Sequence, residues 1–349
     1  MSFRILNVSQ MYNNFIKHFL VILIIFSNHS FGKEFEELFT IYVPIENSSK
    51  IETSINKSFN NLVFRISGSK SPSNIWKIIN SGSSRKDFIQ SYSIKNINMS
   101  SYLEVNFNQE LVINKFKELS IPIVGYSRPV IFFLINVESG SDEPYYVSQE
   151  SNNEIDALIK ETLAQLSNER GLFLELPVLD LDDQRYISNT DILSSPKEHL
   201  ISKYDFDEFV DLKLTNLGLN QWFFSGDIKE DILAENYLED IKKALTDHVE
   251  SKIQSIYKNL IVDTSKTLLL DVTIEGINSY EEYEISKDKL SKIIAISNLE
   301  ILNLNNNTIS YQISLMGNFD TFKNTIENNT FFEIMAENSN QSLNLRFVK

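Results

Sequence analysis

The chain has 349 residues, a formal net charge of −15 and no cysteine. This length allows two or three domains of ordinary size, each with its own hydrophobic core. The acidic balance argues against nucleic acid and anionic membrane surfaces as partners, and the absence of cysteine excludes a disulfide scaffold, a thiol nucleophile and a lipid-modified cysteine.

Residues 1–32 have the layout of a secretory signal peptide. Basic residues precede the apolar run 19–26, and the small residue Gly32 precedes the charged residue Lys33. A membrane-spanning helix needs about 20 apolar residues, so this run is too short to anchor the chain. We therefore expect export, cleavage after Gly32 and a mature protein without a stable membrane anchor. The sequence leaves open whether translation starts at Met1 or Met11.

Residues 33–127, the N-terminal segment, are predicted to form a small α+β domain. Apolar residues alternate over 39–43 as in a strand, and then recur at threes and fours over 51–66 as on one buried helical face. Gly68 fits the left-handed residue that ends such a helix. The remaining predicted elements are a strand over 103–107 and a short helix over 111–119.

Residues 128–263, the middle segment, are predicted to form an α/β domain with a partly parallel sheet. The run 130–137 is apolar on both faces, as in a central strand. Ser151-x-x-Glu154 has the pattern of a capping box, and Gly171 is placed to end the helix that follows. A second buried strand over 172–179 would complete a right-handed parallel crossover. A hairpin over 209–228 and a long closing helix over 241–260 follow.

Residues 264–349, the C-terminal segment, have the order β-α-β-β-α-β, which is typical of a ferredoxin-like fold. Ser279 is placed to cap the first of the two helices, and an Asn-rich turn at 305–307 joins the two middle strands. The predicted strands lie at 268–274, 299–301, 309–315, 332–334 and 343–347, and the predicted helices at 279–290 and 319–326.

Five short motifs follow one another in a set order: Tyr42-Val-Pro-Ile45, Leu62-Val-Phe-Arg-Ile-Ser-Gly68, Ser127-Arg-Pro129, Leu176-Pro-Val-Leu-Asp-Leu-Asp-Asp183 and Trp222 within the predicted hairpin. In their order and spacing they resemble the secreted proteins of Gram-negative bacteria grouped as domain of unknown function 2066. The resemblance covers the chain behind the leader through about residue 230 and is looser beyond. It implies a periplasmic location and brings no activity, cofactor or site residue.

The cluster Asp180, Asp182 and Asp183 is the first candidate site. Counted from Asp180, the spacing of Asp182 and Asp191 is similar to that of a calcium loop, but Arg185 stands where such a loop needs glycine. We therefore favour a strand end at which carboxylates cap backbone N–H groups. A pair of these acids could also serve an acid/base hydrolase if burial raised the pKa of one of them.

Arg65, Arg128 and Trp222 are further candidate binding positions. A guanidinium can bind a carboxylate or phosphate through two parallel hydrogen bonds, and a tryptophan can anchor a partner. For the arginines we favour pairing with nearby acids while the stems cover apolar surface. For Trp222, which is followed by Phe223 and Phe224, we favour a place at least partly in the core.

The remaining chemistry-bearing residues give no site. His199 and His248 lack a second ligand at metal-binding spacing, and the motifs of serine hydrolases, phosphate-binding loops, dinucleotide-binding folds and zinc proteases are absent. The sequence therefore supports no catalytic, cofactor-binding or metal-binding residue.

The favoured hypothesis is a periplasmic, non-enzymatic binding or adaptor protein whose partner is an unknown envelope protein. The alternative is an acid/base hydrolase of envelope glycan or peptide that uses Asp180, Asp182 or Asp183. A third hypothesis places a small ligand at the carboxyl ends of the parallel strands of the middle segment. The oligomeric state stays open.

Overall fold

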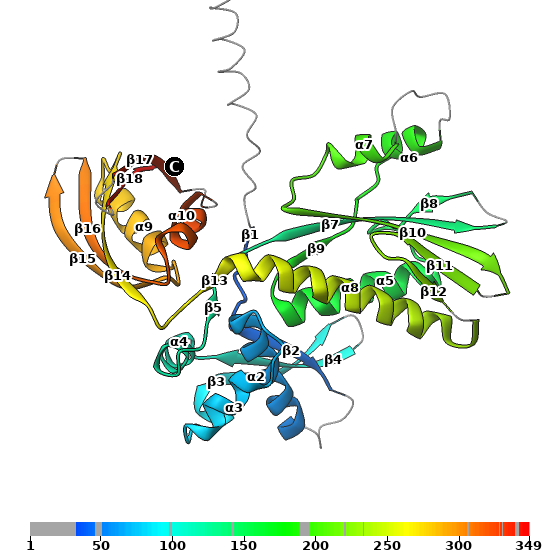
Figure 1. Cartoon of the computed structure of the whole chain (residues 1–349), viewed down its shortest axis with the longest axis horizontal. Coiled ribbons are helices and arrows are strands. Elements are labelled where there is room, and N and C mark those ends of the chain that lie inside the picture. Colours follow the sequence, from blue (N-terminus) through cyan, green and yellow to red (C-terminus); the bar gives the residue numbers. More distant parts are fainter. Residues whose placement is uncertain are drawn as a thin grey trace, which may run out of the picture. The chain divides into compact units, whose positions relative to one another are not determined.

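The computed structural model describes residues 33–45, 51–97, 100–140, 143–188, 196–219, 221–232, 234–305, 307–327, 329, 331–338 and 342–348. Three hydrophobic cores follow one another along these residues, and each has its own sheet and helices (Figure 1). The mixture of antiparallel and partly parallel sheets with helices confirms the predicted α+β and α/β class. Among the described residues, no helix is long and apolar enough to cross a membrane.

The N-terminal segment contains a three-stranded antiparallel sheet in the order β2-β4-β3. The apolar face of the helix α2 packs on β2 and β4, and its residues Phe59, Leu62 and Ile66 are almost completely buried. Gly68 ends α2 with a φ of +70°, which confirms its predicted role as a left-handed stop. The elements are β2 (Thr40–Pro44), α2 (Ile51–Ser67), α3 (Ser73–Asn80), η2 (Arg85–Phe88), β3 (Ile89–Ile97), β4 (Ser100–Phe107) and α4 (Gln109–Glu118).

Two of these elements were not predicted from the sequence. Strand β3 is an edge strand on which Tyr92 and Ile94 are about half exposed, so its pattern of burial does not alternate. Helix α3 is short and buries Asn74, Ile75 and Ile78. The sequence therefore offered no long periodic pattern for either element, because α3 has only eight residues and burial does not alternate along β3.

The middle segment contains a mixed sheet in the order β12-β11-β10-β7-β8, with β9 also paired to β7. Strand β7 runs parallel to both β9 and β10, which confirms the predicted parallel crossover through α5. The elements are β7 (Val130–Ser139), β8 (Tyr145–Tyr146), α5 (Glu154–Arg170), β9 (Phe173–Glu175), α6 (Leu181–Ser188), α7 (Pro196–Ile201), β10 (Glu208–Gly218), β11 (Gln221–Gly226), β12 (Glu230–Ile232), η3 (Ala234–Asn236) and α8 (Tyr237–Leu260).

Both faces of β7 are buried, as its uninterrupted apolar run predicts. Ile131, Phe133 and Ile135 belong to the core that α5 and α8 cover. On the opposite face, Phe132 stacks on Tyr204 with ring centroids 4.4 Å apart. Helices α6 and α7 lie on that side of the sheet (Figure 1).

Two predicted details of the middle segment are wrong. The second strand of the crossover, β9, covers only three residues, because the chain leaves the sheet after Glu175. Helix α5 is capped by Asn153, whose side chain accepts a hydrogen bond from the Asp156 N–H. Ser151 instead bonds to the backbone of Ser148.

The C-terminal segment has the predicted helices and strands, with Ser279 capping α9, but two strands follow its second helix where the order β-α-β-β-α-β has one, and its sheet differs from a ferredoxin-like sheet. The strand order is β15-β16-β14-β18-β17, in which β18 lies parallel to β14 and separates it from β17. Strand β17 therefore lies at the edge of the sheet, and β18 lies between β14 and β17. The elements are β14 (Thr267–Glu275), α9 (Tyr280–Ser291), β15 (Ile296–Asn305), β16 (Thr308–Met316), α10 (Phe319–Glu327), β17 (Phe332–Asn338) and β18 (Ser342–Phe347), and β13 (Ile261–Val262) lies just before this segment.

Short strand pairs join the three segments. The strands β1 (Lys33–Glu34) and β6 (Ser127–Arg128) are antiparallel, as are β5 (Ile123–Val124) and β13. The Thr264 hydroxyl donates to the Ile121 carbonyl at 3.0 Å, and Ile294 belongs to the core of the N-terminal segment. The described residues of all three segments thus belong to one compact unit.

Candidate functional site

Arg128 is fully buried where the carboxyl ends of α2 and α5 meet. Its Nη1 atom lies 3.1 Å from the carbonyl oxygen of Arg65 and 2.9 Å from the hydroxyl of Tyr257. The Arg170 carbonyl lies at 3.5 Å from the same nitrogen, and it also accepts a hydrogen bond from the Tyr257 hydroxyl at 2.9 Å. The carbonyl end of each helix carries partial negative charge, so the guanidinium stabilises both ends at once.

Arg65 and Arg170 lie near the ends of α2 and α5, close to Arg128, and both are buried. Arg65 donates to the carbonyls of Glu37 and Thr40 at 2.9 and 2.8 Å and to the side chain of Asn168 at 2.9 Å. Arg170 donates to the Gly68 carbonyl at 2.9 Å. The N-terminal and middle segments are therefore joined by arginine donors and backbone acceptors.

The arginine partners differ from the acids that the sequence favours. The hydrogen-bond acceptors of Arg65 and Arg128 are backbone carbonyls, one amide and one tyrosine hydroxyl. Burial, followed by the charge of Arg128, lowers the pKa of Arg65 to about 9, so the group is still a cation at pH 7. Neither guanidinium reaches solvent, and both are occupied by groups of the protein.

The acid cluster forms the start of α6. The Asp183 N–H donates to the Asp180 carboxylate at 2.8 Å, and the Asp180 N–H donates to the Asp183 carboxylate at 3.1 Å. This reciprocal pair is a capping box built from two aspartates. The favoured interpretation, in which carboxylates cap backbone donors, matches this geometry.

Asp183 also ties α6 to α7 and to the residues that follow it. Its side chain is completely buried, and the Lys203 ammonium lies 2.7 Å from each of its oxygens. His199 Nε2 lies 3.0 Å from the same carboxylate, and its ring stacks on Tyr186. The two carboxylates raise the pKa of Lys203, while the Asp183 N–H and then Lys203 lower the pKa of Asp180 to about 2.

The described residues of the calcium-like spacing do not form a cluster of ligands. Asp182 is 88% exposed and lies 3.6 Å from Arg185, and Asp191 lies outside the described residues. Within the part of the chain that the structure describes, no group of three or more histidine or acidic side chains could hold a metal ion.

Trp222 and His248 lie in the middle segment. Trp222 on β11 is 6% exposed within the core, and its indole Nε1 has no hydrogen-bond partner among the described residues. Burial is the main cause that lowers the pKa of His248 on α8. The burial of Trp222 agrees with the place in the core that is favoured from the sequence.

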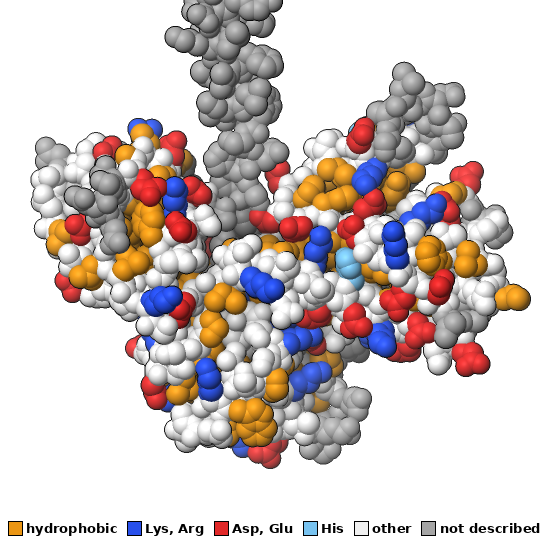
Figure 2. Space-filling view, viewed as in Figure 1, with side chains coloured by type: hydrophobic (Ala, Val, Ile, Leu, Met, Phe, Trp, Pro, Cys, Tyr) orange, Lys and Arg blue, Asp and Glu red, His pale blue; other side chains and the backbone are white. Residues whose placement is uncertain are grey.

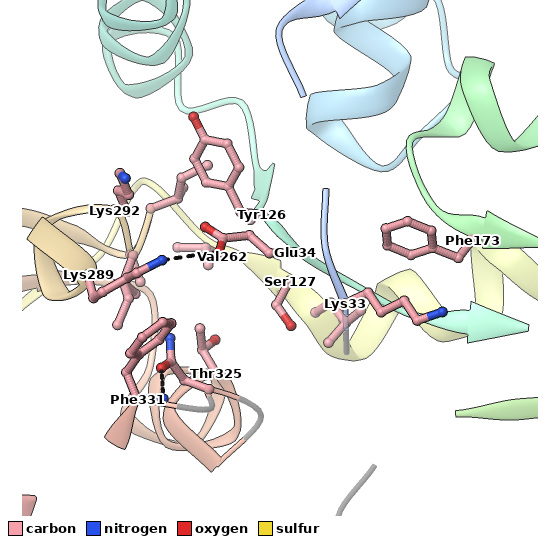
Figure 3. A pocket seen from close by; sticks show the side chains of 16 residues that line it. Lys33, Glu34, Tyr126, Ser127, Phe173, Val262, Lys289, Lys292, Thr325 and Phe331 are labelled. Atoms are coloured by element: carbon pink, nitrogen blue, oxygen red, sulfur yellow. Dashed lines mark hydrogen bonds and ion pairs between the residues drawn. The ribbon is translucent and has the colours of Figure 1, made fainter. Parts of the chain in front are cut away.

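A pocket that the sequence did not reveal lies where the three segments meet (Figure 3). Its volume is about 480 Å³, within the range of small-molecule sites. We call it the Lys289 pocket. The described lining residues are Lys33, Glu34, Gly125, Tyr126, Ser127, Phe173, Leu260, Val262, Lys289, Lys292, Ile293, Ile294, Ala295, Thr325, Asn329 and Phe331.

Among the lysines that line the Lys289 pocket, Lys289 has the longest ion pair. The Lys289 ammonium points toward the Glu34 carboxylate, 3.7 Å away, and lies 4.3 Å from the centre of the Phe331 ring (Figure 3). Lys33 extends away from Glu34 toward Phe173 and pairs with Glu175 outside the lining. Lys292 pairs with Asp288 at 2.8 Å, which raises the pKa of Lys292.

Tyr126 closes one side of the Lys289 pocket. Its hydroxyl donates to the Gln109 side chain at 2.7 Å. Burial, with a smaller contribution from Glu34, raises the pKa of Tyr126 to about 12, so the hydroxyl is a neutral donor at physiological pH. No sequence motif marks this pocket, because each segment contributes only short runs of its lining. Basic residues on an amphipathic helix, such as Lys289 on α9, are otherwise typical of a solvated face.

On the face shown in Figure 2, acidic and basic side chains are interspersed over all three segments. The positive lining of the Lys289 pocket is therefore a local feature.

A scan against protein-family models, a search of curated proteins and a search of solved structures each return no match. The resemblance to domain of unknown function 2066 stays a prediction.

Gly171→Ala tests the contact between α5 and Arg65. Gly171 has a φ of +63°, and an added Cβ would lie 2.7 Å from the Arg65 side chain, whereas Gly82 has a φ of +87° with nothing within 4 Å. We expect Gly82→Ala to lower the free energy of unfolding by about 1 kcal/mol through its backbone alone. Gly171→Ala should lower the free energy of unfolding by about 1–3 kcal/mol more than Gly82→Ala does, because its added methyl group overpacks the Arg65 side chain. Urea unfolding followed by circular dichroism measures both, and equal losses would contradict the role of the contact.

Asp180→Asn tests the charged capping box. The folded-state pKa of Asp180, about 2, lies below its unfolded value of about 4. Its ionised form therefore stabilises the fold above about pH 4, and this contribution disappears as the pH falls through about 2. The stability difference between wild type and Asp180→Asn should be complete at neutral pH and close on acidification. Unfolding curves from pH 7 to pH 2 measure it, with exposed Asp182→Asn as the control; a difference that is constant with pH would be contrary to this expectation.

Proposed function

We propose that this protein is an exported, non-enzymatic binding protein that serves as an adaptor or accessory factor in the cell envelope. The observation that carries the proposal is the contrast between its two candidate sites. The Lys289 pocket is open and has an apolar floor, and its central ammonium is 3.7 Å from the nearest carboxylate. The Asp183 carboxylate is buried and bound to Lys203 and His199.

The location in the periplasm is supported by the sequence. Residues 1–32 have the layout of a leader and lie outside the described residues. The resemblance of the five motifs to the secreted Gram-negative family points to the same location. With cleavage after Gly32, the mature chain would start at Lys33, a residue of the pocket lining.

Cell fractionation and photo-crosslinking test the proposal. We expect the mature chain in the periplasmic fraction, with Lys33 as its first residue by N-terminal sequencing. A photo-reactive amino acid at Asn329, in the pocket lining, should give a specific adduct in living cells that mass spectrometry identifies. The same probe at Leu219, which is 94% exposed at a hairpin turn, is the control.

Two outcomes would contradict the proposal. One is a protein that keeps residues 1–32 and stays in the cytoplasmic fraction. The other is the same set of adducts at Asn329 and Leu219, since a binding site must select its partner.

The alternative function, an acid/base hydrolase at Asp180–Asp183, requires a carboxyl group with a raised pKa. The pKa of Asp180 is lowered instead, to about 2. We expect the purified protein to release no soluble sugar or peptide from peptidoglycan. Release by the wild type that is lost in Asp182→Asn, in which only an exposed carboxylate changes, would establish the hydrolase and end the adaptor proposal.

A further inference from the structure

We propose that the Lys289 pocket binds a small amphiphile with an anionic head group, and that Lys289 holds this head group. The inference rests on the proposed function, because it specifies what the binding protein takes into its pocket. It is carried by the apolar floor, by the charge of the lining and by the incomplete bonding of Lys289.

The floor of the pocket requires a ligand with an apolar body. Val262 from β13 and Ile293, Ile294 and Ala295 from the turn before β15 are at most 9% exposed and present hydrocarbon to the cavity. The aromatic rings of Phe173 and Phe331 lie on either side (Figure 3). Apolar area that leaves water on binding favours association by about 25 cal/mol per Å².

The charge of the lining favours an anion. Lys33, Lys289 and Lys292 line the pocket together with one acid, Glu34, although the whole chain carries a net charge of −15. The carboxylate partners of Lys33 and Lys292, Glu175 and Asp288, are not part of the lining. Each ammonium has a carboxylate partner, but only the partner of Lys289 belongs to the lining, so the cavity wall itself carries more basic than acidic groups. Such a wall attracts anions, and the attraction weakens as salt is added.

Lys289 is the residue placed to hold the head group. Its side chain is 23% exposed, and its ammonium has no hydrogen-bond acceptor among the described residues. The Glu34 carboxylate at 3.7 Å and the Phe331 ring at 4.3 Å attract the charge without completing its hydrogen bonds. A carboxylate or phosphate would supply the missing acceptors through a charge-assisted bond.

Glu34 sets the selectivity of the pocket. Its carboxylate faces Lys289, so an entering anion must compete with it for the ammonium (Figure 3). Removal of the Glu34 charge should therefore strengthen anion binding. A cationic ligand would show the opposite response, since Glu34 is its only acidic contact in the described lining.

The test is a displacement titration on the mature chain. The reporter is the fluorescence of the amphipathic anion 1-anilinonaphthalene-8-sulfonate, and the competitors are decanoate, decyl phosphate, decanol and decyltrimethylammonium. We expect both decyl anions to displace the reporter at concentrations at least tenfold below those of decanol and of the decyl cation. The preference should shrink as salt rises from 50 to 500 mM.

Variants assign the binding to the pocket. Lys289→Met, which keeps the apolar stem, should weaken decanoate binding at least tenfold and leave decanol binding within twofold. Lys323→Met removes a lysine of the same segment that pairs with Glu337 outside the pocket, and it should change neither. Glu34→Gln should strengthen decanoate binding severalfold. Thr325→Trp, which places a large side chain in the pocket, should weaken the binding of both decanoate and decanol. Circular dichroism checks that each variant is folded.

Three results would overturn the inference: equal affinity for decanoate and decanol, unchanged decanoate binding in folded Lys289→Met, or no displacement by any competitor. The proposed function is judged separately by fractionation and crosslinking. If the protein is exported and gives a specific adduct at Asn329 but binds none of the decyl compounds, the proposed function stands and the inference of an anionic amphiphile is wrong.

Discussion

The position of Arg128 between two helix ends is the constraint on which the rest of the structure depends. Helices α2 and α5 bring their carbonyl ends together, and the partial negative charges of these ends would repel each other. One guanidinium with five donors in a fixed fork is suited to several carbonyls at once, and it bonds here to both helix ends and to the turn at Val124 and Gly125. These acceptors are neutral carbonyls that stabilise the cation through their dipoles, and because they do not take up protons, acid does not weaken them.

The same strand that carries Arg128 builds the pocket. In the pairing of β6 with β1, Arg128 lies opposite Lys33 and Ser127 lies opposite Glu34. The anchor of Arg128 therefore fixes the backbone that presents Glu34 to Lys289. Val262, a residue of the apolar floor, is held in place by the pairing of β13 with β5. A binding site at the meeting of several segments can be positioned in this way only if the segments are rigidly joined.

The sequence predicts the elements whose signals are local. Gly68 and Gly171 end helices because each adopts a positive φ, and Ser279 begins one because its hydroxyl accepts from a backbone N–H. The sequence could not predict most acceptors of Arg65 and Arg128, because they belong to residues far away in the chain, such as Thr40 for Arg65 and Tyr257 for Arg128. It could not reveal the pocket either, because Lys289 becomes distinctive only when Glu34 and Phe331 are placed beside it. The sequence also could not predict the order of the last two strands, because the pattern of a hairpin does not show whether β17 or β18 pairs with the rest of the sheet.

The inserted strand β18 has a consequence for how the third sheet assembles. Its neighbours β14 and β17 do not touch as strands, so the sheet is continuous only when Ser342–Phe347 lies between them. The pairing of Val272 on β14 with Leu343 on β18 closes a loop that contains α9, β15, β16, α10 and β17. Contacts of such high sequence separation form late, because the entropy of the loop is lost before the pairing stabilises it. The sheet is therefore complete only when Ser342–Phe347 is available, and the same step fixes the backbone of Phe331, whose carbonyl accepts a hydrogen bond from the Val348 N–H at 2.9 Å.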